Sequence, residues 1–168
     1  MTLFDRLLRR PPLPADVTLD AEEHVVARAT TVDGAEVVAT SYGLWLPGSP
    51  RLGWHLVSKA TWEGAALAVV AASVSETVDG VEILADEPVR RVRLVEPGKV
   101  PEAVHRRVTG SIRSRHHRDL PGGGAWFVQR AVPGRDGVVL QVRPDPGTDA
   151  EAVRRVTAQV AQRVGGES

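Results

Sequence analysis

The sequence of 168 residues contains no cysteine, which excludes disulfides, thiolate nucleophiles and thiolate metal ligands. It also lacks an apolar run long enough to cross a bilayer. Its first residues do not form a signal peptide, because their apolar patch is short and the arginines follow the patch instead of preceding it. These absences predict a cytoplasmic protein.

An excess of charge of either sign is also missing, since 21 basic and 21 acidic residues give a formal net charge of zero. No global field therefore attracts nucleic acid or anionic lipid. Lysine is scarce as well: Lys59 and Lys99 are the only two, and the remaining 19 basic residues are arginine. A single arginine carries little special meaning in a chain that uses arginine in place of lysine.

The clearest pattern that is present lies in residues 53–72, which predict two strands joined by a turn at Glu63-Gly64. The large apolar side chains of the first strand, 53–63, fall on one side of it: Trp54, Leu56, Ala60 and Trp62. This alternation is typical of a strand that is buried on one face. The second strand, 66–72, is apolar on both sides, which predicts a central position in a sheet.

Five further strands are predicted at short intervals along the same part of the chain. They cover residues 24–32, 36–41, 43–46, 81–85 and 89–95. The first two are joined at Asp33-Gly34, which is a specific signal for a hairpin. Seven strands connected mostly by tight turns predict an antiparallel barrel or two packed sheets.

Helical patterns follow these strands. Val104, Val108 and Ile112 are four residues apart and predict a helix over 101–117, which the segment PGGG at 121–124 ends. A second hairpin is predicted with strands 125–132 and 138–143. The chain then ends in a predicted helix over 149–164, which Gly165-Gly166 terminates.

The N-terminal residues 1–19 are predicted to form an amphipathic helix over 2–10 and a proline-rich linker. This helix is expected to pack on the sheet, and binding to a membrane surface or to a partner stays open. The predicted barrel with its capping helix covers residues 20–118. Residues 119–168 form the remaining extension of hairpin and helix.

The most suggestive surface lies between His105 and Arg118, where five arginines and three histidines occur without an acid. On a helix, Arg106, Arg113 and His117 lie opposite the apolar stripe, and two more arginines flank them: Arg107 and Arg118. The face is either solvated and salt-bridged or binds an acidic protein or lipid headgroups. The lack of an aromatic residue among these side chains argues against nucleic acid.

Two aromatic residues, Trp126 and Phe127, begin the second hairpin, so one of them faces away from the core side of the sheet. It either covers the mouth of the barrel or presents an exposed aromatic surface to a partner.

No pattern of catalytic or cofactor-binding residues is present. His116 and His117 would point about 100° apart on a helix, which does not suit a shared metal ion. The glycine-rich segment PGGG at 121–124 leads from a helix into a strand, whereas a phosphate-binding loop leads from a strand into a helix. A nucleophile elbow, G-x-S-x-G, is also missing. We therefore expect no enzyme, no metal and no cofactor.

Several short segments resemble a pattern in uncharacterised actinobacterial proteins with a PH-like (pleckstrin-homology-like) barrel. They are RLGW at 51–54, Val57, ATW at 60–62 and LAV at 67–69. The order of seven short strands and an amphipathic helix is also that of the PH-like barrel. In classical PH domains basic residues at the first hairpin bind phosphoinositides, but the corresponding turn, 31–36, is acidic here. The resemblance therefore implies a binding or scaffolding platform without that lipid site.

Together, the patterns and the resemblance predict an α+β fold: a small antiparallel PH-like β-barrel or sandwich of about seven strands, capped by an amphipathic helix, with a β-hairpin and a C-terminal helix beside it. The predicted function is a non-catalytic interaction or scaffold module that binds a protein partner or self-associates. Two alternatives stay open. One is peripheral binding to anionic lipid through the N-terminal helix and the basic helix, and the other is binding of a small molecule inside the barrel.

Overall fold

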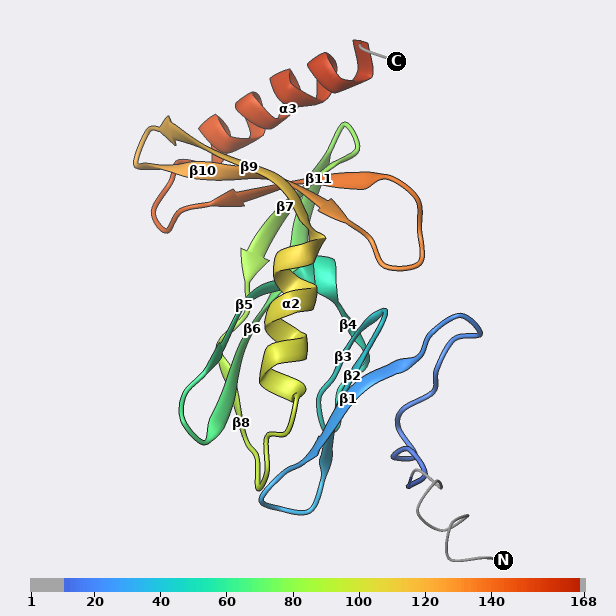
Figure 1. Ribbon diagram of the computed structural model, residues 1–168. Coiled ribbons are helices and arrows are strands. Elements are labelled where there is room, and N and C mark those ends of the chain that lie inside the picture. The colour runs from blue at the N-terminus through green and yellow to red at the C-terminus, as the bar shows by residue number, and fades with distance from the viewer. Residues whose placement is uncertain (1–10, 167–168) are drawn as a thin grey trace, which may run out of the picture.

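The structure, a computed structural model, describes residues 11–166, and strand β6 (Ala66–Val78) runs through both halves of the elongated molecule (Figure 1). The first half of β6 pairs with β5 (Val57–Trp62) and β8 (Arg90–Arg93). Its second half pairs with β7 (Val81–Asp86) after an irregularity in the register. Because β6 contributes side chains to both hydrophobic clusters, it connects the two halves.

The first half is built around the larger of the two hydrophobic clusters. An antiparallel sheet has the order β1 (Val25–Thr30), β2 (Glu36–Thr40), β3 (Gly43–Trp45) and β4 (Leu52–Gly53). The short 3-10 helix η1 (Trp54–Leu56) then leads into β5. Helix α2 (Val100–Ser111) packs against β1, β2, β5 and η1 and buries Val100 and Val104 in this cluster.

The second half contains the remaining strands and the last helix. The remaining strands are β9 (Ile112–Leu120), β10 (Gly123–Ala131) and β11 (Val138–Pro144), and β10 pairs antiparallel with both of its neighbours, β9 and β11. Strand β11 pairs in parallel with β7, with Gln141 opposite Glu82. The resulting sheet has the order β5-β6-β7-β11-β10-β9, with β8 paired to β6. Helix α3 (Ala150–Gly166) buries Val153 and Val156 against one face of it.

Several local predictions are confirmed. Strands β1 and β2 meet in the expected hairpin, in which Gly34 has φ 86°, a conformation that glycine adopts without strain. The second hairpin and the last helix also form where their patterns predict them. The predicted helix over 2–10 lies outside the described residues.

The prediction of one helix over 101–117 is wrong. Helix α2 ends at Ser111, and the following residues form β9, which pairs with β10 along its whole length. Gly110 weakens the helix at this point, and the Ser111 hydroxyl donates to the carbonyl oxygen of Val108 at 2.7 Å. The hydrogen bonds that β9 gains by pairing with β10 thus stabilise a strand more than the helical spacing of apolar residues stabilises a longer helix.

The prediction of one strand over 53–63 is also wrong. Trp54 lies in η1, where its indole Nε1 donates to the carbonyl oxygen of Thr40 at 2.9 Å and its side chain is 2% exposed. Trp62 lies on β5 and is only partly buried. Both indoles contact the same cluster, but they reach it from different elements.

The fold is α+β, with a curled mixed sheet that forms a half-barrel and with two α-helices among residues 11–166 (Figure 1). The strands of the predicted barrel, β1 to β8, pair antiparallel as expected, but the large sheet is mixed because β11 joins β7 in parallel. The last hairpin therefore extends the sheet instead of packing beside it.

Candidate functional site

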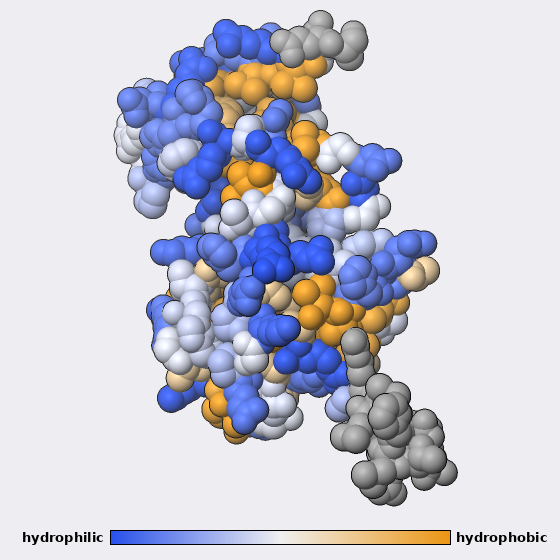
Figure 2. Space-filling model, viewed as in Figure 1, coloured by the Kyte–Doolittle hydropathy of each residue, from blue (hydrophilic) through white to orange (hydrophobic). Residues whose placement is uncertain are grey.

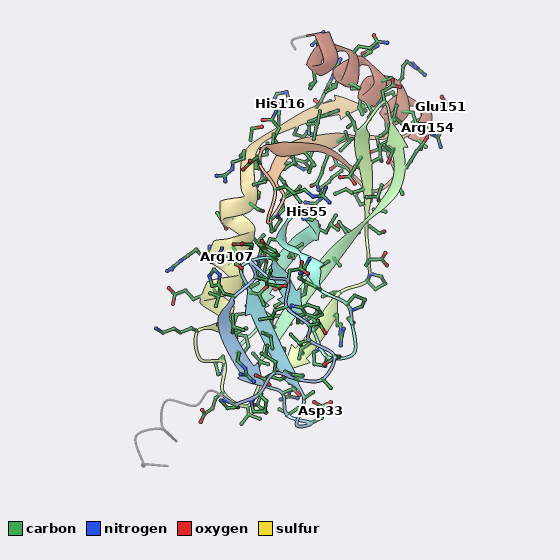
Figure 3. The ribbon with its side chains drawn as sticks, turned by 90° about the vertical axis from the view of Figure 1, so that its right-hand side faces the viewer. Asp33, His55, Arg107, His116, Glu151 and Arg154 are labelled. Carbon is green, nitrogen blue, oxygen red and sulfur yellow. The ribbon has the colours of Figure 1, made fainter. Side chains whose placement is uncertain are left out.

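Strand β9 forms one edge of the large sheet. It pairs with β10 on one side, and no strand among the described residues pairs with its other side. Most of its side chains are exposed, namely Arg113, Ser114, Arg115, His116, Arg118 and Asp119. Figure 3 shows His116 on this outer strand, and Figure 2 shows hydrophilic residues over the tip of β9 and β10. The edge is therefore open and carries mainly positive charge.

Two basic side chains of β9 contact the aromatic ring of Trp126 on β10. The guanidinium carbon of Arg115 lies 4.4 Å from the centroid of the indole, within the range of a cation–π contact. The rings of His117 and Trp126 are 4.9 Å apart, edge to face. His117 Nε2 also lies 2.7 Å from an Asp145 carboxylate oxygen. Asp145 thus holds the imidazole that supports the indole.

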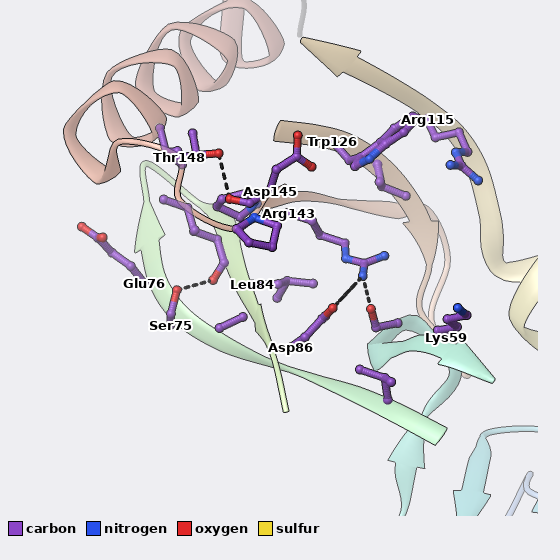
Figure 4. A pocket seen from close by; sticks show the side chains of 18 of the residues that line it. Lys59, Ser75, Glu76, Leu84, Asp86, Arg115, Trp126, Arg143, Asp145 and Thr148 are labelled. Atoms are coloured by element: carbon purple, nitrogen blue, oxygen red, sulfur yellow. Dashed lines mark hydrogen bonds and ion pairs between the residues drawn. The ribbon is translucent and has the colours of Figure 1, made fainter. Parts of the chain in front are cut away.

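A groove of about 910 Å³ lies beside this aromatic cluster (Figure 4). Side chains from β5, β6, β7, β11, β10, β9 and α3 line it. The pairing register places Arg115, Trp126 and Arg143 on the same side of the sheet, and all three line the groove. The curvature of the sheet therefore brings residues from distant parts of the chain to one cavity.

The acids of the groove are all paired with basic side chains of the protein. The pairs are Glu76 with Arg154 at 2.8 Å, Asp86 with Arg143 at 3.2 Å and Asp145 with His117 at 2.7 Å. Lys59 and Arg115 have no acidic partner in the described part of the chain. The groove therefore has an uncompensated positive charge.

Arg143 occupies the wall of the groove. Its Nη2 donates to the hydroxyl of Ser58 and to the Asp86 carboxylate, as Figure 4 shows. Its Nε is buried and has no hydrogen-bond partner among the described residues. A buried donor of this kind is costly unless a further acceptor reaches it.

Arg130 lies deeper and is 2% exposed. Its guanidinium donates to the carbonyl oxygens of Trp54 and Val57, each at 2.8 Å, and to the hydroxyl of Ser111 at 2.7 Å. Burial, together with the nearby Arg143, lowers the pKa of Arg130 to about 10. Its acceptors lie on the first residue of η1, the first residue of β5 and the last residue of α2. Arg130 is therefore a structural clamp between the two halves.

A second buried polar cluster surrounds the Glu23 carboxylate. It accepts hydrogen bonds from Thr40, from the Trp45 indole at 3.2 Å and from Arg51 at 2.6 Å. Burial raises the pKa of Glu23, but these hydrogen bonds outweigh it, and the pKa lies below its ordinary value. These hydrogen bonds tie the segment before β1 to β2, β3 and the loop that carries Arg51.

The predicted partner-binding residues are distributed over three elements. Arg106 and Arg107 lie on α2, where Arg106 pairs with Glu102 at 2.8 Å. Arg113, His117 and Arg118 lie on β9. The prediction of one helical face containing Arg106, Arg113 and His117 is wrong, because the helix ends between them.

The two aromatic residues point to opposite sides of β10. Trp126 faces the groove, whereas Phe127 is 9% exposed and packs with Val142 and Val153 under α3. The expectation that only one of them faces the core is confirmed. The proposal of Phe127 as a contact residue is wrong because α3 covers it.

Sequence reasoning did not identify the other basic residues of the groove. Lys59, Arg130 and Arg143 are single charges on strands that lie far apart in the chain. The signal available was the alternation of Trp126, Val128 and Arg130, which places a charge on the same face as apolar residues.

Within residues 11–166, no three histidine, aspartate or glutamate side chains come together as metal ligands. The helices of this same part of the chain are also too short or too polar to cross a membrane. Comparison of the chain with protein-family models, curated proteins and solved structures finds no match.

Proposed function

We propose that this protein is a non-catalytic interaction module that binds an acidic, extended segment of a partner protein along β9. The observation that carries the proposal is the open edge of this strand of nine residues, on which three arginines and two histidines outnumber one aspartate. The unpaired backbone N–H and C=O groups of an edge strand are a template for a further strand.

The charges on β9 favour an acidic partner. Arg115 and His117 lie on the groove side, and Arg118 lies on the opposite side, because side chains alternate along the strand. An added strand would therefore meet positive charge on both of its faces. Opposite charges on neighbouring strands stabilise the pairing, so acidic side chains suit both faces of the ligand.

The same charges disfavour pairing of β9 with β9 of a second copy. Such a pairing would place arginines near arginines, and like charges opposite each other destabilise a sheet. Of the two predicted partners, a different protein is therefore preferred over self-association at this edge.

The PH-like resemblance and the cytoplasmic location remain part of the proposal. The order of strands β1 to β8 followed by α2 supports the resemblance over residues 20–118. Peripheral binding to anionic lipid is the weaker alternative, because the basic residues assigned to one helical face are divided between α2 and β9.

The proposal is tested with a fluorescent eight-residue peptide in which pairs of glutamates alternate with pairs of valines, which places glutamate on both faces of an extended strand. We expect saturable binding by fluorescence anisotropy, weakened by salt, and slower hydrogen exchange in the amides of β9. The double variant R115E/R118E should weaken binding by at least about tenfold, since each lost charge pair across strands contributes up to about 1 kcal/mol.

The matched control is R93E/R155E, which changes the charge equally at exposed residues of β8 and α3. It should bind the peptide as the unaltered protein does. Equal binding of a lysine–valine peptide, or equal losses in both double variants, would exclude the proposed edge. Co-sedimentation with anionic vesicles but no peptide binding would favour the lipid alternative.

A further inference from the structure

We propose that the groove beside Trp126 is a binding site for a small organic anion that carries a phosphate or carboxylate on a flat ring. Its volume of about 910 Å³ suits a ligand of this size. The residues that form it come from β5, β6, β7, β9, β10, β11 and α3, so the site lies on a face of the curved sheet and not along the backbone edge of β9. The two proposed sites share Arg115, whereas Lys59 belongs to the groove alone.

The charge of the groove selects an anion. Five basic side chains line it, namely Lys59, Arg115, Arg130, Arg143 and Arg154, against three acids, Glu76, Asp86 and Asp145. Each acid already has a basic partner within the protein. A concave site of one sign concentrates ions of the opposite sign, so the positive charge of Lys59 and Arg115 is available to a ligand.

Arg143 provides a directed donor in the same wall, because its Nη1 makes no hydrogen bond with the described residues and is not buried. The side chain is held in place by Ser58 and Asp86, which bind its Nη2. An oxygen of a bound phosphate or carboxylate would accept a charge-assisted hydrogen bond from Nη1. Figure 4 shows Arg143 and Lys59 at the same end of the groove.

The indole of Trp126 and nearby aliphatic side chains provide the apolar surface against which a flat ring of the ligand would pack. Trp126 is half-buried in the wall, and Val70, Leu84 and Val128 line the same groove. Arg115 and His117 contact the indole and limit its rotation. Ligand pockets commonly combine such an apolar surface with a few polar groups that orient the ligand.

The test is a titration of the full chain with phenyl phosphate, followed by the NMR signal of the Trp126 indole N–H. This signal is identified by its loss in W126F. We expect a saturable shift, with weaker binding of inorganic phosphate and no binding of benzyl alcohol at the same concentrations. K59A and R115A should each weaken the binding of phenyl phosphate by about tenfold, as expected for loss of one charged contact.

The control is R118A, which removes an equal charge from the exposed side of β9 and does not line the groove. It should leave the binding of phenyl phosphate unchanged. Absence of a saturable shift, or an equal loss in R118A and K59A, would overturn the proposal. If inorganic phosphate bound as tightly as phenyl phosphate, the proposed contact between the ligand ring and Trp126 would be wrong. Because Lys59 lies on β5, K59A separates this site from the peptide edge and should not change peptide binding.

Discussion

Arg130 Nη2 lies 2.8 Å from the carbonyl oxygen of Trp54, although the two residues are 76 positions apart in the chain. The same guanidinium binds Val57 on β5 and Ser111 at the end of α2. The contact therefore joins the last hairpin to the first half of the molecule. It also lies beside the groove, whose shape depends on how the two halves meet.

Replacing Arg130 with methionine should lower the free energy of unfolding by about 3 kcal/mol, because it removes the guanidinium that binds the carbonyl oxygens of Trp54 and Val57 and the hydroxyl of Ser111. Urea denaturation measures this change. The control R163M removes an exposed arginine of α3 and should have little effect. A similar decrease in the free energy of unfolding in R130M and R163M would show that Arg130 does not hold the two halves together.

Replacing Trp54 with alanine should destabilise the protein by about 4 kcal/mol, since it creates a large cavity and leaves the Thr40 carbonyl without its indole donor. The same change at Trp62 should cost less, because Trp62 is only partly buried. Thermal and urea unfolding of W54A and W62A compare the two. A larger loss in W62A would contradict this assignment of the core.

Replacing Glu23 with glutamine should reduce stability at pH 7 by about 2 kcal/mol, because the charged acceptor of Arg51 and Trp45 is lost. The pKa of Glu23 is lowered in the folded protein. The ionised Glu23 side chain therefore contributes fully to stability above its ordinary pKa of about 4.3. This contribution is lost as the pH falls through the pKa of Glu23 in the folded protein.

The difference in the free energy of unfolding between E23Q and the unaltered protein should consequently shrink as the pH falls from 5 to about 3. Urea unfolding at each pH measures this difference. The neighbouring exposed residue gives the control, E22Q, for which we expect little difference at any pH. A difference for E23Q that stays constant with pH would contradict the lowered pKa of Glu23.

Replacing Gly124 with alanine should disturb the aromatic cluster. A Cβ atom at this position would lie 2.6 Å from the His117 ring and 2.7 Å from the Arg118 carbonyl oxygen. The imidazole must then move away from Trp126 and Asp145, and we expect a loss of about 1–3 kcal/mol from overpacking. NMR signals of His117 and Trp126, together with urea unfolding, measure the effect. The control G110A places a Cβ atom in open space on α2 and should not lower the free energy of unfolding.

The candidate site could be predicted only in part. A basic segment before an aromatic hairpin identified Arg113, His117, Arg118 and Trp126 as a region of interest, because these residues are close in the sequence. Lys59 and Arg143 gave no such signal, since they approach this region only through the pairing of β5 with β6 and of β7 with β11. Residues distant in sequence become neighbours through strand order, which local patterns do not encode.

The sequence by itself determined the elements whose signals are local. The turn at Asp33-Gly34, the apolar strand beginning at Ala66, the last hairpin and helix α3 all follow from turn residues and periodicity. Tertiary structure alone decided that α2 ends at Ser111, that Trp54 lies in a 3-10 helix and that β11 joins β7 in parallel. In each of these cases, long-range pairing or burial supplied more free energy than the local preference of the chain.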